Sequence, residues 1–110
     1  MAVEMQSVIE MMMETSRRID KATRVLHTLA KDKAEAQHNY VIKKAQETLI
    51  LKQEGMSVTL IQDIVKGKCA DELLERDRTE EVFKASVESL RAMQSQLSAL
   101  QSISKYQSEV

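Results

Sequence analysis

The chain predicts an all-α fold, a long antiparallel helical hairpin of coiled-coil type with a short helical elbow. It has no proline and only two glycines, Gly55 and Gly67, which stand twelve residues apart just past mid-chain. Because proline removes a backbone hydrogen bond and glycine favours helix ends, residues 2–54 and 70–107 contain no strong helix breaker. Strong helix formers dominate both segments. The whole chain of 110 residues contains only three aromatic residues. One helical-hairpin domain over residues 1–110 is therefore expected.

The first long helix is expected over residues 3–54. Its apolar residues recur at the three-four spacing that gathers side chains on one helix face. The members of this stripe are Ile19, Ala22, Leu26, Leu29, Ala36 and Tyr40. After Tyr40 the stripe is expected to move sideways to Ile42, Ala45 and Leu49, because a straight helix drifts from a strict seven-residue repeat. Lys33 interrupts this seam, and the polar residues 31–33 would permit a bend.

The elbow is expected over residues 55–69. Gly55 is suited to the left-handed conformation that ends a helix, and Gly67 is expected to end the short elbow helix in the same way. Either Ser57 or Thr59 is suited to cap the start of that helix. Its apolar residues, from Val58 to Val65, are expected to cover the end of the hairpin core.

The second long helix is expected over residues 70–107. Its apolar stripe comprises Leu73, Phe83, Val87, Leu90, Met93 or Gln94, Leu97, Leu100 and Ile103. Residues 75–81, ERDRTEE, are entirely polar. Such a stretch does not suit a fully apolar partner face, so it should be solvated or matched by opposite charge.

The unequal lengths of the two long helices predict a Met-rich overhang. With an elbow this short, the second helix reaches back only to about residue 17, which leaves residues 1–16 without an internal partner. This segment holds Met1, Val3, Met5, Val8, Ile9, Met11, Met12 and Met13. An unpaired helix of this length is marginal in water, and two helices cover each other on one side only. Both points predict a homodimer that forms a four-helix arrangement.

A set of apolar residues on both helices is the candidate interface with a second copy or another partner. Its members are Met5, Val8, Ile9, Met12, Ile19, Leu26, Leu97 and Leu100.

The charge is unevenly distributed although the chain carries a net charge of only −1. Residues 1–16 carry −3, residues 17–52 carry +5, residues 53–69 are neutral and residues 70–110 carry −3. In an antiparallel hairpin Lys43, Lys44 and Lys52 fall beside the acidic residues of 71–81, so internal pairing is expected there.

The remaining basic cluster is the candidate nucleic-acid-binding site: Arg17, Arg18, Lys21 and Arg24. Residues 98–110 offer it almost no opposite charge, and Arg17, Lys21 and Arg24 share one helix face. A basic face of this kind suits phosphates, or else is simply solvated. No aromatic residue interleaves the cluster, so base stacking is not expected.

No reactive constellation is visible, so the chain is expected not to be an enzyme. The single cysteine, Cys69, cannot form an internal disulfide and is expected to be a small packed residue. His27 and His38 lie eleven residues apart, about 16 Å along a helix, which is too far for one metal ion. We therefore expect no cofactor, no metal and no small-molecule substrate. The absence of an 18-residue apolar run and of a signal-like leader predicts a cytoplasmic protein without a membrane partner.

Three segments resemble a family of small, mostly uncharacterised helical proteins encoded by phages and prophages of Gram-positive bacteria. They are RRIDKATRVL, LILKQEGMSVTLIQDIVKGK and ERDRTEEVFKASVESLRAMQSQLSALQSI, which together span roughly residues 16–107. The stretch EGMSVTLIQDIVKG, residues 54–67, is the most specific part of this resemblance. The resemblance implies phage origin and a role in the host cytoplasm rather than a particular reaction.

Two functional hypotheses follow. The first is a non-enzymatic interaction protein, a dimeric helical scaffold that binds another phage or host protein. The alternative is an accessory nucleic-acid-binding protein in phage replication or recombination, which would bind DNA through the basic cluster.

Overall fold

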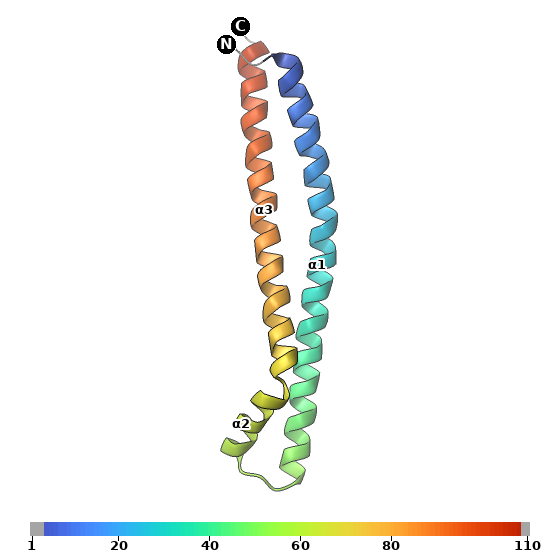
Figure 1. The fold of residues 1–110 in the computed structure, drawn as a ribbon, viewed down its shortest axis with the longest axis vertical. Helices are drawn as coiled ribbons and strands as arrows, with labels where there is room; N and C mark the ends of the chain where they lie inside the picture. The colour runs from blue at the N-terminus through green and yellow to red at the C-terminus, as the bar shows by residue number, and fades with distance from the viewer. Residues whose placement is uncertain (1–3, 109–110) are drawn as a thin grey trace. The chain divides into compact units, whose positions relative to one another are not determined.

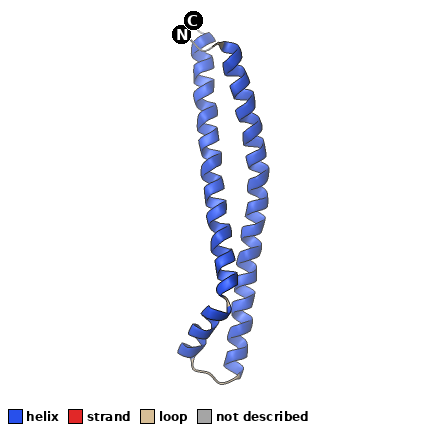
Figure 2. Ribbon diagram, viewed as in Figure 1, coloured by secondary structure: helices blue, strands red, loops and turns tan. Residues whose placement is uncertain are grey.

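The computed structural model describes residues 4–108 and contains three α-helices (Figure 1). They are α1 (Met5–Gln53), α2 (Val58–Lys68) and α3 (Ala70–Ser108). Within residues 4–108 all regular secondary structure is helical (Figure 2), which confirms the predicted all-α hairpin. Met1 and Val3, predicted to belong to the overhang, lie outside the described residues. No helix among these three combines the length and the apolar character that crossing a membrane requires.

The chain forms two compact units. The first comprises Met1–Thr28 with Lys84–Val110, and the second comprises Leu29–Phe83. Helices α1 and α3 each contribute one part to each unit, and α2 belongs entirely to the second.

In the first unit the start of α1 pairs with the last turns of α3. The Ser104 hydroxyl donates to the Met5 sulfur at 3.6 Å, so α3 lies antiparallel to α1 as far as the first turn of α1. Val8 and Thr15 of α1 are buried, as is Leu100 of α3. The prediction that residues 1–16 lack an internal partner is therefore wrong for the described residues of that segment.

The position of α2 explains this correction. Lys68, the last residue of α2, forms an ion pair with Glu47, so α3 starts beside this turn of α1 and not beside the end of α1. The last residues of α1 pack against α2 instead, through Leu51, Ile61 and Val65. The 39 residues of α3 are then long enough to reach Met5.

The eight candidate interface residues are mostly intramolecular. Val8 and Leu100 are buried within the chain, and five others are half-buried: Met5, Met12, Ile19, Leu26 and Leu97. Ile9 is the one member of the set that is exposed, at 40%. The half-buried members keep part of their surface exposed, so their role in contact with a second copy or another partner stays a prediction.

In the second unit α2 covers a small apolar core, as the sequence predicts. Leu51 of α1 packs with Ile61 and Val65 of α2 and with Cys69, and each of the four is almost completely buried. Three half-buried residues complete the core: Tyr40, Met56 and Ile64.

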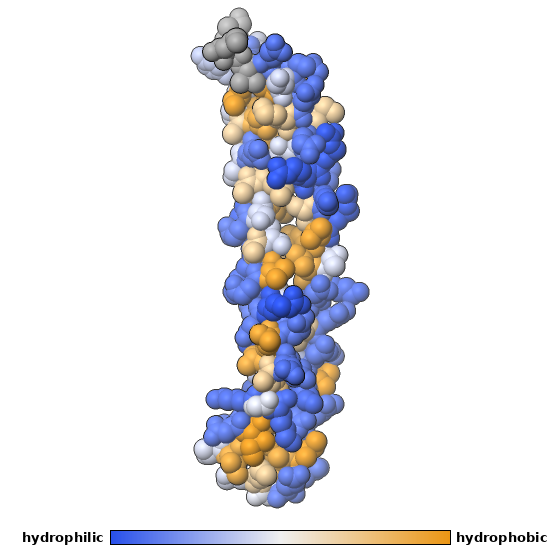
Figure 3. Space-filling model, in the orientation of Figure 1, coloured by the Kyte–Doolittle hydropathy of each residue, from blue (hydrophilic) through white to orange (hydrophobic). Residues whose placement is uncertain are grey.

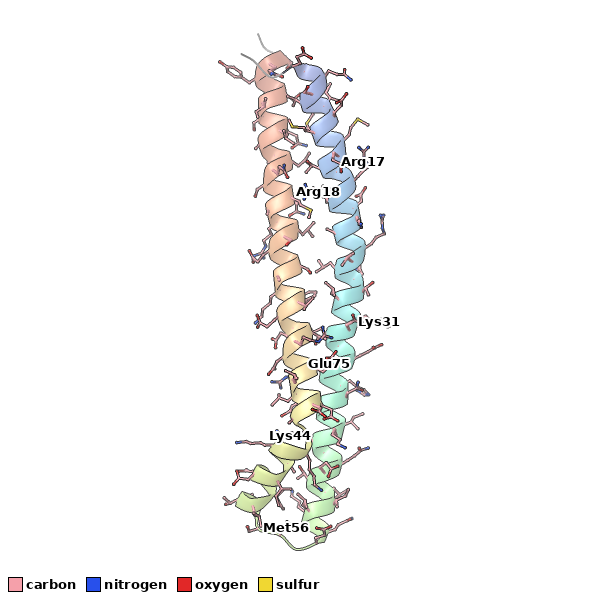
Figure 4. The ribbon with its side chains drawn as sticks, viewed as in Figure 1. Arg17, Arg18, Lys31, Lys44, Met56 and Glu75 are labelled. Atoms are coloured by element: carbon pink, nitrogen blue, oxygen red, sulfur yellow. The ribbon has the colours of Figure 1, made fainter. Side chains whose placement is uncertain are left out.

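The turn from α1 into α2 is a Schellman motif. Gly55 has φ +80°, the left-handed conformation predicted for it. The Gly55 amide donates to the Lys52 carbonyl and the Met56 amide donates to the Leu51 carbonyl, at 3.1 and 3.3 Å. Met56, at this turn in Figure 4, packs on the core that contains Leu51. Ser57 is then the N-cap of α2, because its hydroxyl accepts from the Leu60 amide.

Gly67 has a different role from the one predicted. It lies inside α2, and Gly55 is the one glycine with positive φ. Helix α2 ends at Lys68, and Cys69 is its C-cap with φ −102° and ψ 11°. The left-handed ending predicted for Gly67 is therefore wrong.

The inward-facing side of α1 keeps one register throughout. After Tyr40 the half-buried and buried positions include Lys43, Glu47 and Leu51, again at three-four spacing, with Thr48 half-buried beside them. Ile42, Ala45 and Leu49 are exposed, so the predicted sideways shift is wrong. The protein keeps its seven-residue repeat by burying the aliphatic stems of polar residues there.

The inward-facing side of α3 also includes polar residues. Ile103 is exposed and Ser104 takes the inward position, whereas Met93 faces inward and Gln94 does not. In the polar segment 75–81, Thr79 is buried and its hydroxyl donates to the carbonyls of Glu75 and Arg76. Opposite α3, Lys33 places its ammonium 4.9 Å from the centre of the Phe83 ring. The polar groups on the inward-facing side are therefore satisfied by hydrogen bonds to the backbone of their own helix or by cation–π contact with an aromatic ring.

Candidate binding groove

A groove of about 400 Å³ runs along one side of the second unit, between α1 and α2. We call it the α1–α2 groove. Its lining from α1 is Tyr40, Lys44, Thr48 and Lys52; its lining from α2 and the start of α3 is Val58, Ile61, Gln62, Val65, Lys66, Cys69 and Leu73. The α1 residues follow one another every four positions, which puts them in one row along the helix. The volume lies within the range of ordinary ligand-binding clefts.

The groove is apolar in its floor and basic at its edge. Ile61, Val65 and Cys69 form the buried floor. The charged residues that line it are Lys44, Lys52 and Lys66, and no carboxylate is among its lining residues. Figure 3 shows the apolar side chains gathered over α2 and the adjacent end of α1. The arrangement suits an apolar ligand that also carries negative charge.

The apolar surface continues from the groove onto the outer side of α1. A second hollow is lined by Val41, Ala45 and Leu49, and shares Tyr40, Lys44, Thr48 and Lys52 with the groove. Large parts of three aliphatic side chains are in contact with water here: Val58 is 66% exposed, Leu49 57% and Val41 52%. Contiguous exposed apolar surface of this kind is typical of interaction sites.

Tyr40 is held in place by two cations. The Arg76 guanidinium lies 4.7 Å from the centre of its ring and the Lys44 ammonium lies 5.8 Å from it. Such cation–π contacts fix both the ring and the long basic side chains. Tyr40 therefore joins α1 to α3 and at the same time lines the groove.

Glu47 joins α1 to the end of α2. Its carboxylate oxygens lie 3.3 Å from the ammonium groups of Lys68 and Lys43. The hydrogen bond from Lys68, together with that from Lys43, lowers the pKa of Glu47. Because both lysines favour the charged carboxylate, Glu47 stays ionised in the folded protein to more acidic pH than a free glutamate.

Cys69 is a structural residue. Its side chain is buried, and this desolvation, followed by the nearby charges of Glu72 and Glu47, raises the pKa of the thiol. The protonated thiol is the weakly nucleophilic form, so Cys69 packs as a small apolar residue, as expected from the sequence.

The predicted basic cluster lies on the exposed side of α1 in the first unit. Arg17, Arg18, Lys21 and Arg24 are all exposed, and Figure 4 labels Arg17 and Arg18 on α1. Arg17 is not unpaired, because it forms an ion pair with Glu14 of its own helix at 3.0 Å. The cluster is therefore an exposed and partly neutralised face of α1.

The charge pairing predicted between α1 and α3 takes another form. Lys43 pairs with Glu47 of its own helix, and Lys44 packs on Tyr40. On α3, Arg78 pairs with Glu75 and Arg76 pairs with Asp77. The Lys43–Glu47 and Arg78–Glu75 pairs have the four- and three-residue spacings that helices favour, whereas Arg76 and Asp77 are adjacent in the chain.

Acidic residues at the start of α3 line a small hollow beside α1. Asp71, Glu72 and Glu75 surround a small hollow with Ala36 and Asn39, yet no group of three or more histidine, cysteine or acidic residues among 4–108 is arranged to hold a metal ion. His27 and His38 are both exposed on α1.

The groove was not predicted from the sequence. One signal for it was present, because the apolar residues Val41 and Leu49 fall off the seven-residue repeat and Val58 begins an unusually apolar short helix. Comparisons of the chain with protein-family models, with curated proteins and with solved structures found no match. The resemblance to small phage proteins therefore stays a prediction.

Proposed function

We propose that this chain is a non-enzymatic interaction protein and that its protein partner binds in the α1–α2 groove. The observation that carries the proposal is the exposed apolar surface around that groove, formed by Val41, Leu49 and Val58. The resemblance of residues 16–107 to small phage proteins supports a phage or host protein as the partner. The proposed scaffold is a homodimer, because a single hairpin leaves much of its seam half-exposed.

Site-specific photo-crosslinking tests this function. A benzoylphenylalanine residue is placed at Val58, in the groove, and separately at Val25, an exposed position of the first unit. In the cells that naturally contain the protein, illumination should give a discrete adduct from position 58 and not from position 25. Equal labelling at both positions, or none at position 58, contradicts the proposal.

The second candidate function is nucleic-acid binding through the basic cluster, supported by the exposure of all four of its side chains. It predicts binding to labelled single- or double-stranded DNA that weakens steeply between about 50 and 200 mM salt. Replacing Arg17 and Arg18 together by Glu should abolish this binding, as measured by fluorescence anisotropy. An unchanged affinity in that double variant removes the nucleic-acid function.

A further inference from the structure

We propose that the α1–α2 groove takes an amphipathic helix of another protein, with apolar residues on one face and carboxylates on its flanks. The inference rests on the proposed function and adds the chemistry of the partner. It is drawn from the dimensions, the lining and the charge of the groove.

The dimensions fit a helix of about three turns. The α1 wall runs from Tyr40 to Lys52, which is about 18 Å at the rise of an α-helix. The α2 wall presents Val58, Ile61 and Val65, spaced by three and four residues. Side chains in rows form ridges on the two helical walls. The apolar residues of a third helix can fit into the grooves between these ridges.

The charge of the lining selects an acidic partner. Lys44 and Lys52 stand on the α1 wall and Lys66 on the α2 wall, so cations border the groove on both sides. The nearby acid Glu47 does not line the groove and is already bound by Lys68 and Lys43. A helix with glutamates or aspartates on both flanks would meet a lysine on either side, whereas a basic helix would meet like charge.

The same lysines argue against a second copy of the groove as the occupant. In a symmetric contact each surface patch meets its own copy. Lys44, Lys52 and Lys66 of one chain would then face the same three lysines of the other across a shared apolar surface. That arrangement is repulsive, so the groove favours a different, acidic chain.

The first experiment measures binding of a synthetic probe to the full-length protein by fluorescence anisotropy. The probe is a fluorescein-labelled helical peptide of 16 residues, with leucine on one face and glutamate on both flanks. A matched peptide carries lysine in place of every glutamate. We expect the acidic peptide to bind at least tenfold more tightly than the basic one, and to lose affinity as salt is raised.

Two charge-matched variants locate the binding. The groove variant replaces Lys44, Lys52 and Lys66 by Glu, and the control variant replaces Lys21, Lys31 and Lys105 by Glu, so both change the net charge equally. All six lysines are exposed, and circular dichroism checks that both variants fold. The groove variant should lose at least tenfold in affinity for the acidic peptide, and the control variant less than threefold.

Three outcomes overturn the proposal: equal binding of the two peptides, no binding at 100 μM of the protein, or equal losses in the two variants. A groove variant whose mass in solution changes from the wild-type value would instead show that a second copy occupies the groove. Photo-crosslinking at Val58 separates this failure from failure of the proposed function. A discrete Val58 adduct without acidic-peptide binding leaves the interaction role standing and removes only the acidic helix.

Discussion

The two glycines of the chain have opposite conformational requirements. Gly55 has a left-handed φ of +80°, and a Cβ added there would contact no other atom. Substitution of Gly55 should therefore lower stability through backbone conformation and not through a steric clash. Gly67 is helical inside α2, and a Cβ added there also meets open space. At such a site alanine lowers the entropy of the unfolded chain without strain.

Alanine at each glycine should therefore shift stability in opposite directions. Gly55→Ala should destabilise the protein by about 1 kcal/mol, because the left-handed region is unfavourable for a residue with a Cβ. Gly67→Ala should stabilise it by about 0.5–1 kcal/mol. Urea unfolding followed by circular dichroism measures both free energies. The same sign of change in the two variants would show that the turn or the end of α2 is wrongly described.

Glu47 makes stability depend on pH. Its pKa is lowered in the folded state, mainly by the hydrogen bond from Lys68, so the unfolded chain takes up the proton first as pH falls. The stabilisation is therefore present at neutral pH and is lost as pH falls through the folded pKa. The thermal midpoint of the wild type should fall between pH 7 and about pH 3, and that of Glu47→Gln should fall less. Identical slopes in the two proteins would contradict this linkage.

At the scale of the helices, adjacent residues test the seam of the first unit. Leu26 is half-buried between α1 and α3, whereas its neighbour Val25 is 46% exposed. Leu26→Asp should cost about 2 kcal/mol or more, because it places an unpaired charge in the contact, and Val25→Asp should cost less than about 1 kcal/mol. Both variants add the same charge, so chemical denaturation isolates the effect of position. Equal costs would show that the seam is misplaced.

The two long helices were predictable, because the chain has no proline and both of its glycines fall between α1 and α3. Helix register was harder to predict. A hydropathy pattern follows apolar residues, and around Tyr40 it moved to Ile42 and Leu49, whereas the protein instead packs the stems of Lys43 and Glu47. A hydropathy pattern counts such residues as polar, although their long aliphatic stems can be buried between helices. The charged end is then stabilised by a salt bridge or by contact with an aromatic ring.

The pairing of the helix ends and the groove were not predictable from local patterns. Both depend on where α2 lies, and nothing in its sequence states that it packs back along the end of α1 through Leu51 and Val65. That placement sets the point at which α3 begins and leaves Val58 beside the row of α1 residues that lines the groove. The basic cluster, by contrast, was placed correctly on an exposed helix face because it depends on helical spacing alone.

For the molecule as a whole, the small core predicts self-association. Among the described residues, Val8 and Cys69 are the hydrophobic side chains with an exposed fraction of 2% or less. Leu26, Leu90 and Leu97, which lie along the contact between α1 and α3, are only half-buried. A second hairpin would cover these residues and complete a four-helix arrangement. Size-exclusion chromatography with light scattering should therefore give twice the 12.5 kDa mass of the chain. A mass of 12.5 kDa throughout the micromolar range would disprove the homodimer.

The fluorescence of Tyr40 can report on the occupancy of the α1–α2 groove. The chain contains no tryptophan and only two tyrosines, of which Tyr106 is largely exposed in the first unit and Tyr40 lines the groove between two cations. In a Tyr106→Phe variant all tyrosine emission would come from Tyr40. A ligand that displaces Lys44 from the ring would then change that emission directly, so the filling of the groove can be followed without attaching a dye to the protein.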